Sequence, residues 1–266
     1  MKGRGKVALV TGGSSGIGKA VCERLAQEGY VVYELSRRDR ESQPNIRHIS
    51  CDVTDEVAVK QSVEQIISEI GKIDLLVNNA GFGISGAVEF TNIEEAKKLF
   101  DVNFFGNVIV TSAVAKHMRK NECGKIINIS SVAGDLSIPF QSFYSAGKAA
   151  INSLTLALRN ELKEFNVQVC ALMPGDVHTC FTEVRQKSVL GDDVYGGKIS
   201  RAVSVMEHDE LNGMKPQKLA DKVFKLAKKK RLKPFYTCGF KYGLFLFLAK
   251  ILPRSLSNFI VGKIYS

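Results

Sequence analysis

The fold of this chain is decided by the stretch Val7-Ala8-Leu9-Val10-Thr11-Gly12-Gly13-Ser14-Ser15-Gly16-Ile17-Gly18. Its first four residues form a short apolar run of the kind that makes a buried parallel strand. The glycines then follow the pattern G-x-x-x-G-x-G ahead of a helix. Glycine lets the backbone approach a ligand closely, and the first N–H groups of a helix face an anion. The stretch therefore predicts a strand, a phosphate-binding turn and a helix.

The rest of the chain continues this alternation of strand and helix. Strands are expected at 31–35, 46–51, 74–77, 124–129 and 167–173, and helices at 19–29, 55–70, 93–117 (one helix or two), 144–165 and 218–230. Strands that alternate with helices of this length indicate βαβ units. The sequence therefore predicts an α/β fold. It is a single Rossmann-like, doubly wound parallel sheet with helices on both faces and an extended C-terminal helical segment, in one domain over 1–266.

Three parts of that domain are expected to differ in role. Residues 6–180 form the cofactor and catalytic core, 180–215 a substrate lid, and 216–266 a basic, apolar C-terminal extension. The stretch 179–214 shows no clean period, so we expect a mobile loop with short helices. Phe235-Tyr236 starts a possible last strand. The apolar run 243–252 is too short for the ~20 residues that span a bilayer.

Charge is concentrated in the extension. Residues 215–266 hold 13 Lys and Arg and one acid, Asp221, while the whole chain carries +10. Such a tail suits an anionic substrate, a membrane surface or nucleic acid. No nucleic-acid reader motif is present, so nucleic acid is disfavoured and a possible peripheral membrane contact remains. Six dispersed cysteines and no secretory leader predict free thiols, no metal site and a cytoplasmic protein, possibly membrane-associated.

The cofactor's 2′ position is usually read just after the second strand of such a fold. Ser36-Arg37-Arg38 follows that strand, and the guanidinium of Arg37 can fork onto a 2′-phosphate. NADP(H) is therefore favoured over NAD(H). Glu34 selects NAD(H) instead if the strand ends earlier.

Downstream, Tyr144 and Lys148 share one face of a helix in the spacing Y-x-x-x-K. A tyrosine whose pKa falls toward neutrality can move a proton while the cofactor moves a hydride. Lys148 stabilises the tyrosinate by its charge. With the glycine turn, the pair points to an NAD(P)-dependent carbonyl or alcohol oxidoreductase.

Several motifs in order make the chain resemble the short-chain dehydrogenase/reductase family, closely over residues 6 to about 180. They are TGGSSGIG (11–18), NNAG (78–81), Asn103 in DVNFFG, Ser131 in INISSVAG, YSAGK (144–148) and PGDVHT (174–179). The resemblance implies a catalytic tetrad of Asn103, Ser131, Tyr144 and Lys148. It also implies a homodimer, possibly a tetramer, built on the helices at 93–117 and 144–165.

The expected cofactor site follows the ends of the strands. Its residues are Gly12, Ser14, Ser15, Gly16, Ile17, Gly18, Ser36, Arg37, Arg38, Asp52, Val53, Asn79, Ala80, Gly81, Tyr144, Lys148, Pro174, Gly175, Val177 and Thr179. Asp52 either accepts from the adenine or caps the next helix. Asn79 either borders the ribose or cross-links strands. The resemblance places Pro174, Gly175, Val177 and Thr179 at the carboxamide of the nicotinamide.

The substrate is expected to be a hydrophobic small molecule, because the lid and the segment 136–140 offer many apolar side chains. A hydroxysteroid or bile acid fits this expectation best. A 3-oxoacyl thioester, reduced by the same residues, is the alternative. A non-catalytic NADP(H)-binding regulator or scaffold is an alternative of another class.

Overall fold

The computed structural model describes residues 5–265 and contains a seven-stranded parallel sheet. The sheet has the order β3-β2-β1-β4-β6-β7-β9. Its strands are β1 (Val7–Thr11), β2 (Val31–Ser36), β3 (Ile46–Ser50), β4 (Leu75–Asn78), β6 (Gly124–Ile129), β7 (Val167–Pro174) and β9 (Phe235–Cys238). From β1 the sheet extends through β2 to β3, and from β4 it extends the other way through β6 and β7 to β9. A ligand crevice usually forms where the strand order reverses in this way, here between β1 and β4.

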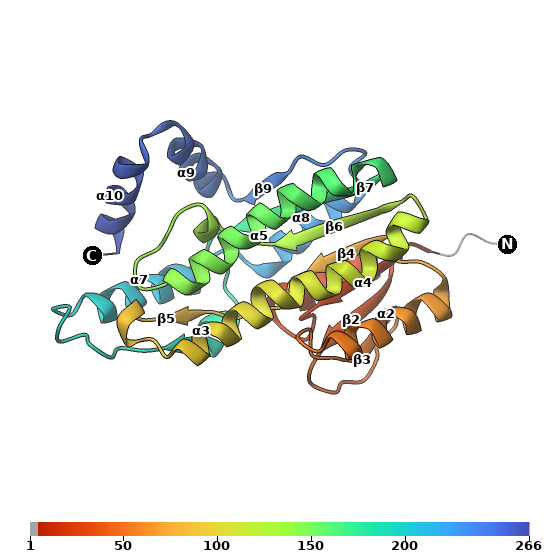
Figure 1. Ribbon diagram of the computed structural model, residues 1–266, viewed down its shortest axis with the longest axis horizontal. Helices are drawn as coiled ribbons and strands as arrows, with labels where there is room; N and C mark the ends of the chain where they lie inside the picture. The colour runs from red at the N-terminus through yellow and green to blue at the C-terminus, as the bar shows by residue number, and fades with distance from the viewer. Residues whose placement is uncertain (1–4, 266) are drawn as a thin grey trace.

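Helices cover both faces of this sheet (Figure 1). One layer holds α2 (Glu56–Ile70), α4 (Gly106–Lys120) and α5 (Ser142–Glu161), and the other holds α1 (Gly16–Gln27) and α8 (Pro216–Lys228). The predicted doubly wound α/β fold is confirmed.

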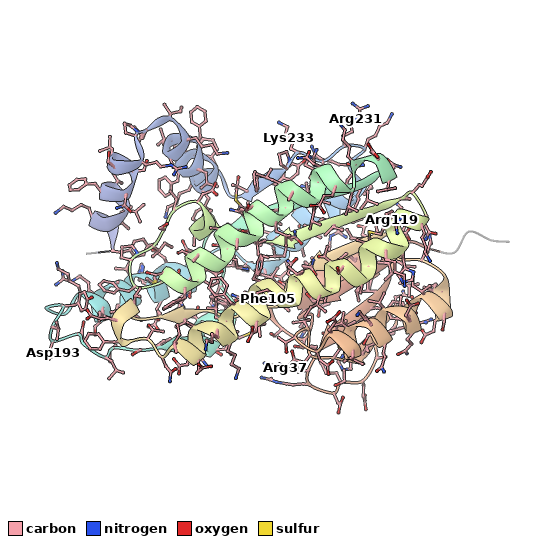
Figure 2. The ribbon with its side chains drawn as sticks, viewed as in Figure 1. Arg37, Phe105, Arg119, Asp193, Arg231 and Lys233 are labelled. Atoms are coloured by element: carbon pink, nitrogen blue, oxygen red, sulfur yellow. The ribbon has the colours of Figure 1, made fainter. Side chains whose placement is uncertain are left out.

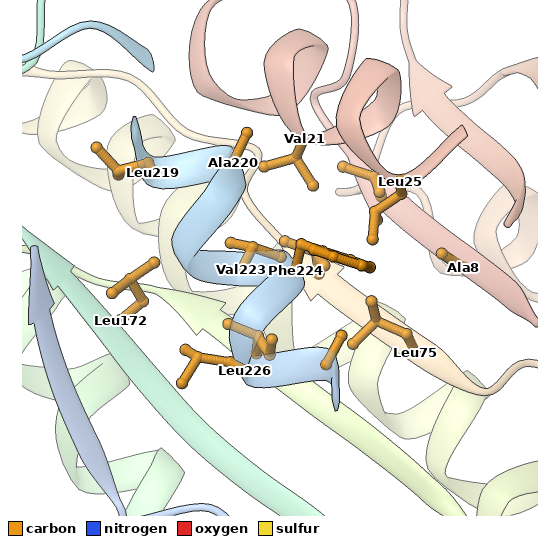
Figure 3. Close-up of a cluster of buried hydrophobic side chains, with 14 of the residues drawn as sticks. Ala8, Val21, Leu25, Leu75, Leu172, Leu219, Ala220, Val223, Phe224 and Leu226 are labelled. Atoms are coloured by element: carbon orange, nitrogen blue, oxygen red, sulfur yellow. The ribbon is translucent and has the colours of Figure 1, made fainter. Parts of the chain in front are cut away.

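The alternation of side chains along each strand explains why β1 is apolar throughout. Ala8 and Val10 face the core beneath α1 and α8, where Figure 3 shows Ala8. Val7 and Leu9 face the core beneath α2 and α4. All four side chains are fully buried. A strand buried on both faces must be apolar at every position.

The helix expected at 93–117 is one continuous helical run with an irregular middle. It consists of α3 (Ile93–Phe100), a π-helical turn at Asp101–Phe105 and then α4. Single π turns inside α-helices occur often at functional sites. Here the turn carries Asn103 toward the centre of the molecule.

The expectation of a mobile loop at 179–214 is wrong for its second half. The 14-residue helix α7 (Lys198–Leu211) buries Ile199, Ala202, Val203 and Met206, a helical spacing that the sequence analysis overlooked. Ahead of it come α6 (Phe181–Val184) and β8 (Gln186–Lys187), and β8 pairs in parallel with the short strand β5 (Ile84–Ser85).

Beyond β9 the chain ends in two further helices, α9 (Phe240–Ile251) and α10 (Arg254–Ile264). Figure 1 shows them standing away from the sheet, beside the ends of the strands that carry the site. Neither these nor the other helices within residues 5–265 are long and apolar enough to cross a membrane. All six cysteines are free, and residues 5–265 contain no cluster of metal-ligating side chains.

Candidate active site

A cavity of about 1070 Å³ opens at the carboxyl ends of β1, β2, β4, β6 and β7. The glycine turn, the loops after these strands, α6, and the helices α9 and α10 line it. Apart from Gly18 and Asn103, every predicted site residue contributes to this wall. Parts of the chain that lie more than 200 residues apart therefore share one crevice.

The glycine turn has the close packing that phosphate binding requires. Gly12 has φ +65°, and a Cβ added there would lie 2.9 Å from the Cα of Ala80. A Cβ at Gly18 would lie 2.2 Å from the carbonyl oxygen of Gly12. Ser15 precedes α1 without capping it by its side chain, so the first N–H groups of the helix face the cavity for a ligand.

The end of β2 fits a 2′-phosphate. The hydroxyl oxygen of Ser36 is buried and has no hydrogen-bond partner within residues 5–265. Arg37 and Arg38 are exposed at the cavity, and Figure 2 shows Arg37 projecting from this end of the sheet. Arg40, which the sequence analysis did not single out, donates a 2.8 Å hydrogen bond from Nη1 to the carbonyl oxygen of Ser14. The guanidinium groups of Arg37, Arg38 and Arg40 thus lie around the place where a 2′-phosphate would bind.

Glu34 is not available to select NAD(H). Strand β2 continues to Ser36, so Glu34 lies two residues inside the strand, where it is buried. Its Oε2 lies 2.6 Å from Nδ1 of His48 on β3. The alternative that the sequence left open is therefore wrong, because this carboxylate faces a neighbouring strand.

The residues expected at the adenine and ribose have structural partners of their own. Asp52 Oδ1 accepts from the N–H and hydroxyl of Thr54, at 3.0 and 2.8 Å, while Asp55 caps α2. Asn79 donates from Nδ2 to the carbonyl oxygens of Thr11 and Gly12, and so joins the ends of β1 and β4. Val53, Ala80 and Gly81 line the cavity beside them.

Tyr144 and Lys148 lie one turn apart on α5, and both face the cavity. Lys148 Nζ donates a 2.9 Å hydrogen bond to the carbonyl oxygen of Ile129 and lies 5.5 Å from the centre of the Tyr144 ring. Burial lowers the pKa of Lys148 to about 8. Burial also raises the pKa of Tyr144 to about 12, and the Ser131 side chain offsets part of that rise. Without cofactor, the tyrosine pKa therefore moves opposite to the expected direction.

The two serines after β6 have different surroundings. Ser130 is buried and donates a 2.6 Å hydrogen bond to Asn152 Oδ1. Ser131 Oγ accepts from the N–H of Ala133 at 3.1 Å, and its side chain also hydrogen-bonds to Tyr144, which directs the hydroxyl toward the reacting group. The geometry therefore favours Ser131 over Ser130 as a donor at the substrate oxygen.

Asn103 is held by the loop after β4. Its Oδ1 accepts from the N–H of Phe82 at 3.0 Å, and its Nδ2 donates to the carbonyl oxygen of Phe82 at 2.8 Å. The π-helical turn leaves backbone groups near Asn103 outside the regular helical pattern. Asn103 is buried behind Gly81 and fixes the wall of the cavity.

The loop after β7 brings the predicted nicotinamide residues to the centre of the cavity. Pro174, Gly175, Val177 and Thr179 line it, and Thr179 packs on Gly16 of the first turn, with 3.3 Å from its Cβ to a Cβ built on that glycine. This contact joins the two ends of the cofactor site.

The substrate side combines the apolar lid residue Phe181 with two charged residues that the sequence analysis did not assign, Arg185 and Glu210. The Phe181 ring of α6 lies 5.7 Å from the ring of Tyr144. Buried Arg185 lies over Phe181 and forms an ion pair with Glu210 of α7. Their spacing along the chain gave no signal, because the contacts depend on how the lid folds.

Comparison with known proteins agrees with this geometry. Residues 6–189 match the family model described as short chain dehydrogenase. A 3-ketodihydrosphingosine reductase of Bacteroides thetaiotaomicron is 42% identical over 234 residues, which cover 87% of each chain. An NADPH-dependent 3-dehydrocapnine reductase of Ornithobacterium rhinotracheale is 31% identical, covering 97% of this chain and 96% of the relative.

A solved structure described as ElxO with NADP bound is also similar. It has a TM-score of 0.75 and 27% identity, covering 90% of this chain and 99% of that chain. The cations after β2 and the open turn before α1 fit the same cofactor in this chain.

Proposed function

The chain belongs to the short-chain dehydrogenase family, and from that premise we propose that it reduces the ketone of a long-chain 2-amino-3-ketone such as 3-ketodihydrosphingosine. It is an oxidoreductase that acts on CH–OH groups with NADP(H). The carrying observation is the 42% identity to a 3-ketodihydrosphingosine reductase, spread over 87% of both chains. A second relative, 31% identical, is named for the reduction of another 3-dehydro compound.

The shape and lining of the cavity support a long-chain substrate. Beyond Tyr144 the walls are apolar on several sides, with Leu136 and Ile138 before α5, Val184 on the lid, and Phe245 and Val261 on the last two helices. The cavity of about 1070 Å³ combines the cofactor site with this apolar region, and the apolar region is where an alkyl chain would lie.

The chemistry follows from the groups at the inner end of the cavity. When bound, NADPH supplies the hydride that reaches the ketone carbon. The Tyr144 hydroxyl would donate a proton to the carbonyl oxygen, on which negative charge develops. The Ser131 hydroxyl would donate a hydrogen bond to the same oxygen. Lys148 would hold the ribose hydroxyls and favour the tyrosinate left after proton transfer.

Asn103 would act in positioning. Its amide fixes the Phe82 backbone at one side of the cavity. The π-helical turn around Asn103 frees backbone groups that would hold a water linking Lys148 to solvent. After each turnover Lys148 would pass a proton to the tyrosinate and would regain one from solvent through that water.

Other substrates share this chemistry and rank lower. A hydroxysteroid or bile acid fits the cavity volume and its apolar walls, but neither curated relative cited above is named for a steroid. A 3-oxoacyl thioester carries the same 3-keto arrangement without the amine. A regulator or scaffold without turnover has no use for Ser131, Tyr144 and Lys148 gathered around one cavity.

The assembly and setting are part of the proposal. We place the protein in the cytoplasm as a homodimer, with the whole chain as one catalytic domain. The free thiols support the first statement. Phe105 and Leu156, which are 52% and 43% exposed on the α4–α5 layer, support the second. Large apolar side chains on one helical layer are typical of a subunit interface.

The test measures NADPH oxidation by absorbance with 3-ketodihydrosphingosine, acetoacetyl thioester and a 3-ketosteroid, and identifies the product by mass spectrometry. We expect turnover of the amino ketone to the 3-hydroxy product. Tyr144→Phe should lower kcat by about 10³-fold and leave NADPH binding unchanged. Tyr195→Phe, which removes a hydroxyl outside the cavity, is the matched control. Turnover of the thioester or steroid alone would overturn the substrate assignment.

A further inference from the structure

The two C-terminal helices leave an unusual amount of apolar surface uncovered. Within α9 only Leu246 is buried, and α10 buries no residue. Ten of the twenty large apolar side chains that are exposed in residues 5–265 lie in this pair, and the most open are Phe240, Phe247, Ile251 and Phe259, at 60–88% exposure. Isolated exposed apolar residues need no explanation, but a contiguous patch marks an interaction surface.

The charges on this helix pair all have one sign. Lys241, Lys250, Arg254 and Lys263 lie between 240 and 265, and the sequence holds no Asp or Glu there. Lys250 and Arg254 flank the turn at Pro253 that joins the helices. Basic side chains that border an apolar face are typical of helices that lie on anionic lipid.

The same helices also form a wall of the active-site cavity. Tyr242 and Phe245 of α9, with Val261 and Ile264 of α10, line it on one side, next to Tyr265. The outward face of the pair therefore lies next to an opening that leads to Tyr144. A partner that binds to this face would therefore lie at the entrance through which a hydrophobic substrate reaches the cavity.

The dimensions exclude a span and fit a surface contact. Helices of 12 and 11 residues are about 18 and 16 Å long at 1.5 Å per residue, against about 30 Å of hydrocarbon. Pro253 separates them, so they cannot form one longer helix. Short amphipathic helices of this kind lie in the plane of the membrane interface.

We propose that the α9–α10 pair docks on the surface of an anionic phospholipid bilayer and that the active-site cavity opens toward that surface. A second copy of the chain is the competing occupant. A two-fold interface through the same face brings its four cations against the partner's identical four. No acid in 240–265 offsets that repulsion, whereas anionic headgroups complement it.

The chain contains no tryptophan, so one introduced tryptophan reports on its own surroundings. Phe247→Trp places the probe on the proposed face, and Val57→Trp places it at a 63% exposed site on α2 as the matched control. The full-length protein is mixed with vesicles of neutral phosphatidylcholine, or of phosphatidylcholine with phosphatidylglycerol. We expect a blue shift and quenching by brominated lipid for Phe247→Trp alone, stronger with the anionic lipid and weaker in high salt.

Charge and apolar surface are then tested separately by vesicle sedimentation. Lys250→Glu with Arg254→Glu should weaken binding to anionic vesicles by at least about tenfold, since each cation near such a surface adds to the affinity. Phe247→Glu with Phe259→Glu should abolish it, and Val57→Glu should leave it unchanged. Binding is measured without substrate, so it does not depend on the amino-ketone activity.

Two outcomes would overturn the proposal. One is that the wild-type protein fails to sediment with anionic vesicles while circular dichroism shows it folded. The other is that Phe247→Glu with Phe259→Glu changes the sedimentation mass of lipid-free protein, which assigns the face to a second copy.

Discussion

The Tyr242 hydroxyl donates a 2.6 Å hydrogen bond to Oδ2 of Asp176, and this contact attaches the first turn of α9 to the loop after β7. The ring of Tyr242 also covers Gly175, where an added Cβ would lie 2.1 Å from the ring carbon Cε1. Burial raises the pKa of Asp176, and the tyrosine hydrogen bond opposes that rise. The C-terminal helices are thereby connected to the loop predicted to hold the nicotinamide.

Tyr242→Phe should loosen this connection without altering the reacting groups. Losing a hydrogen bond to a partly buried carboxylate costs about 1–2 kcal/mol. We expect amide hydrogen exchange in α9 to quicken about tenfold, and the KM for a long-chain substrate to rise more than kcat falls. Tyr236→Phe, which removes a hydroxyl that accepts from the Lys233 N–H, is the control. Unchanged exchange in α9 would show that the contact has no part in holding the helices.

Replacing Arg37 and Arg38 together with Ala should change cofactor preference. Both side chains lie at the cavity beside the unpartnered Ser36 hydroxyl, where they face the position of a 2′-phosphate. Charge-assisted bonds of this kind are worth about 1.5–3 kcal/mol each, so the Kd for NADPH should rise at least about 100-fold.

The Kd for NADH, which lacks that phosphate, should change less than threefold. Arg231→Ala provides the control, because Figure 2 shows Arg231 far from Arg37. An equal loss of affinity for both cofactors would mean that the arginines support the loop rather than read the phosphate.

The core of this fold was predictable because its signals are local. The strand, turn and helix that begin at Val7 depend on residues close in sequence, and strands buried on both faces appear as apolar runs. Six of the strands and the helices of both layers were predicted to within a few residues, and the seventh strand was named as possible at Phe235-Tyr236. The cofactor NADP(H) was also predicted correctly, from the arginines after β2.

The missed features depend on contacts between distant residues. The stretch that holds α7 was expected to be a mobile loop with short helices, because glycines and charged residues obscured its apolar spacing. The packing of Val203 against Ala87 makes the longer helix evident. Tyr242 and Arg40 also lie at the site, but the segments that contain them carry no recognisable sequence motif. The pKa of Tyr144 rises because its burial outweighs the hydrogen bond with Ser131, and that burial depends on how distant segments pack around the ring.

Phe105→Glu combined with Leu156→Glu should give a monomer if the proposed dimer uses the α4–α5 layer. Both side chains are large and exposed there, and four like charges at a two-fold interface oppose association. Sedimentation should show half the wild-type mass, with thermal stability of the isolated chain retained. Val57→Glu on α2 should remain dimeric. A wild-type protein that sediments as a monomer would reject the interface outright.

Lys148→Met should make the protein more stable at pH 7, at the expense of activity. Burial lowers the lysine pKa from its ordinary value to about 8, so folding at pH 7 places an unfavourable charge in the interior. A pKa shift of this size destabilises the folded protein by about 3 kcal/mol at pH 7. The variant also loses the hydrogen bond from Lys148 to Ile129, which stabilises the folded protein by about 1 kcal/mol. Between pH 8 and 10 the unfolded state binds more protons at this residue, so wild-type stability rises relative to the variant. Urea unfolding at pH 7 and pH 10 should therefore show an advantage of about 2 kcal/mol for the variant that is lost at the higher pH.

Lys125→Met, at a lysine outside the cavity whose pKa is also lowered by burial, is the control for removing a positive charge elsewhere in the protein. A variant less stable than wild type at both pH values would mean that Lys148 holds α5 to β6 more strongly than its charge opposes folding.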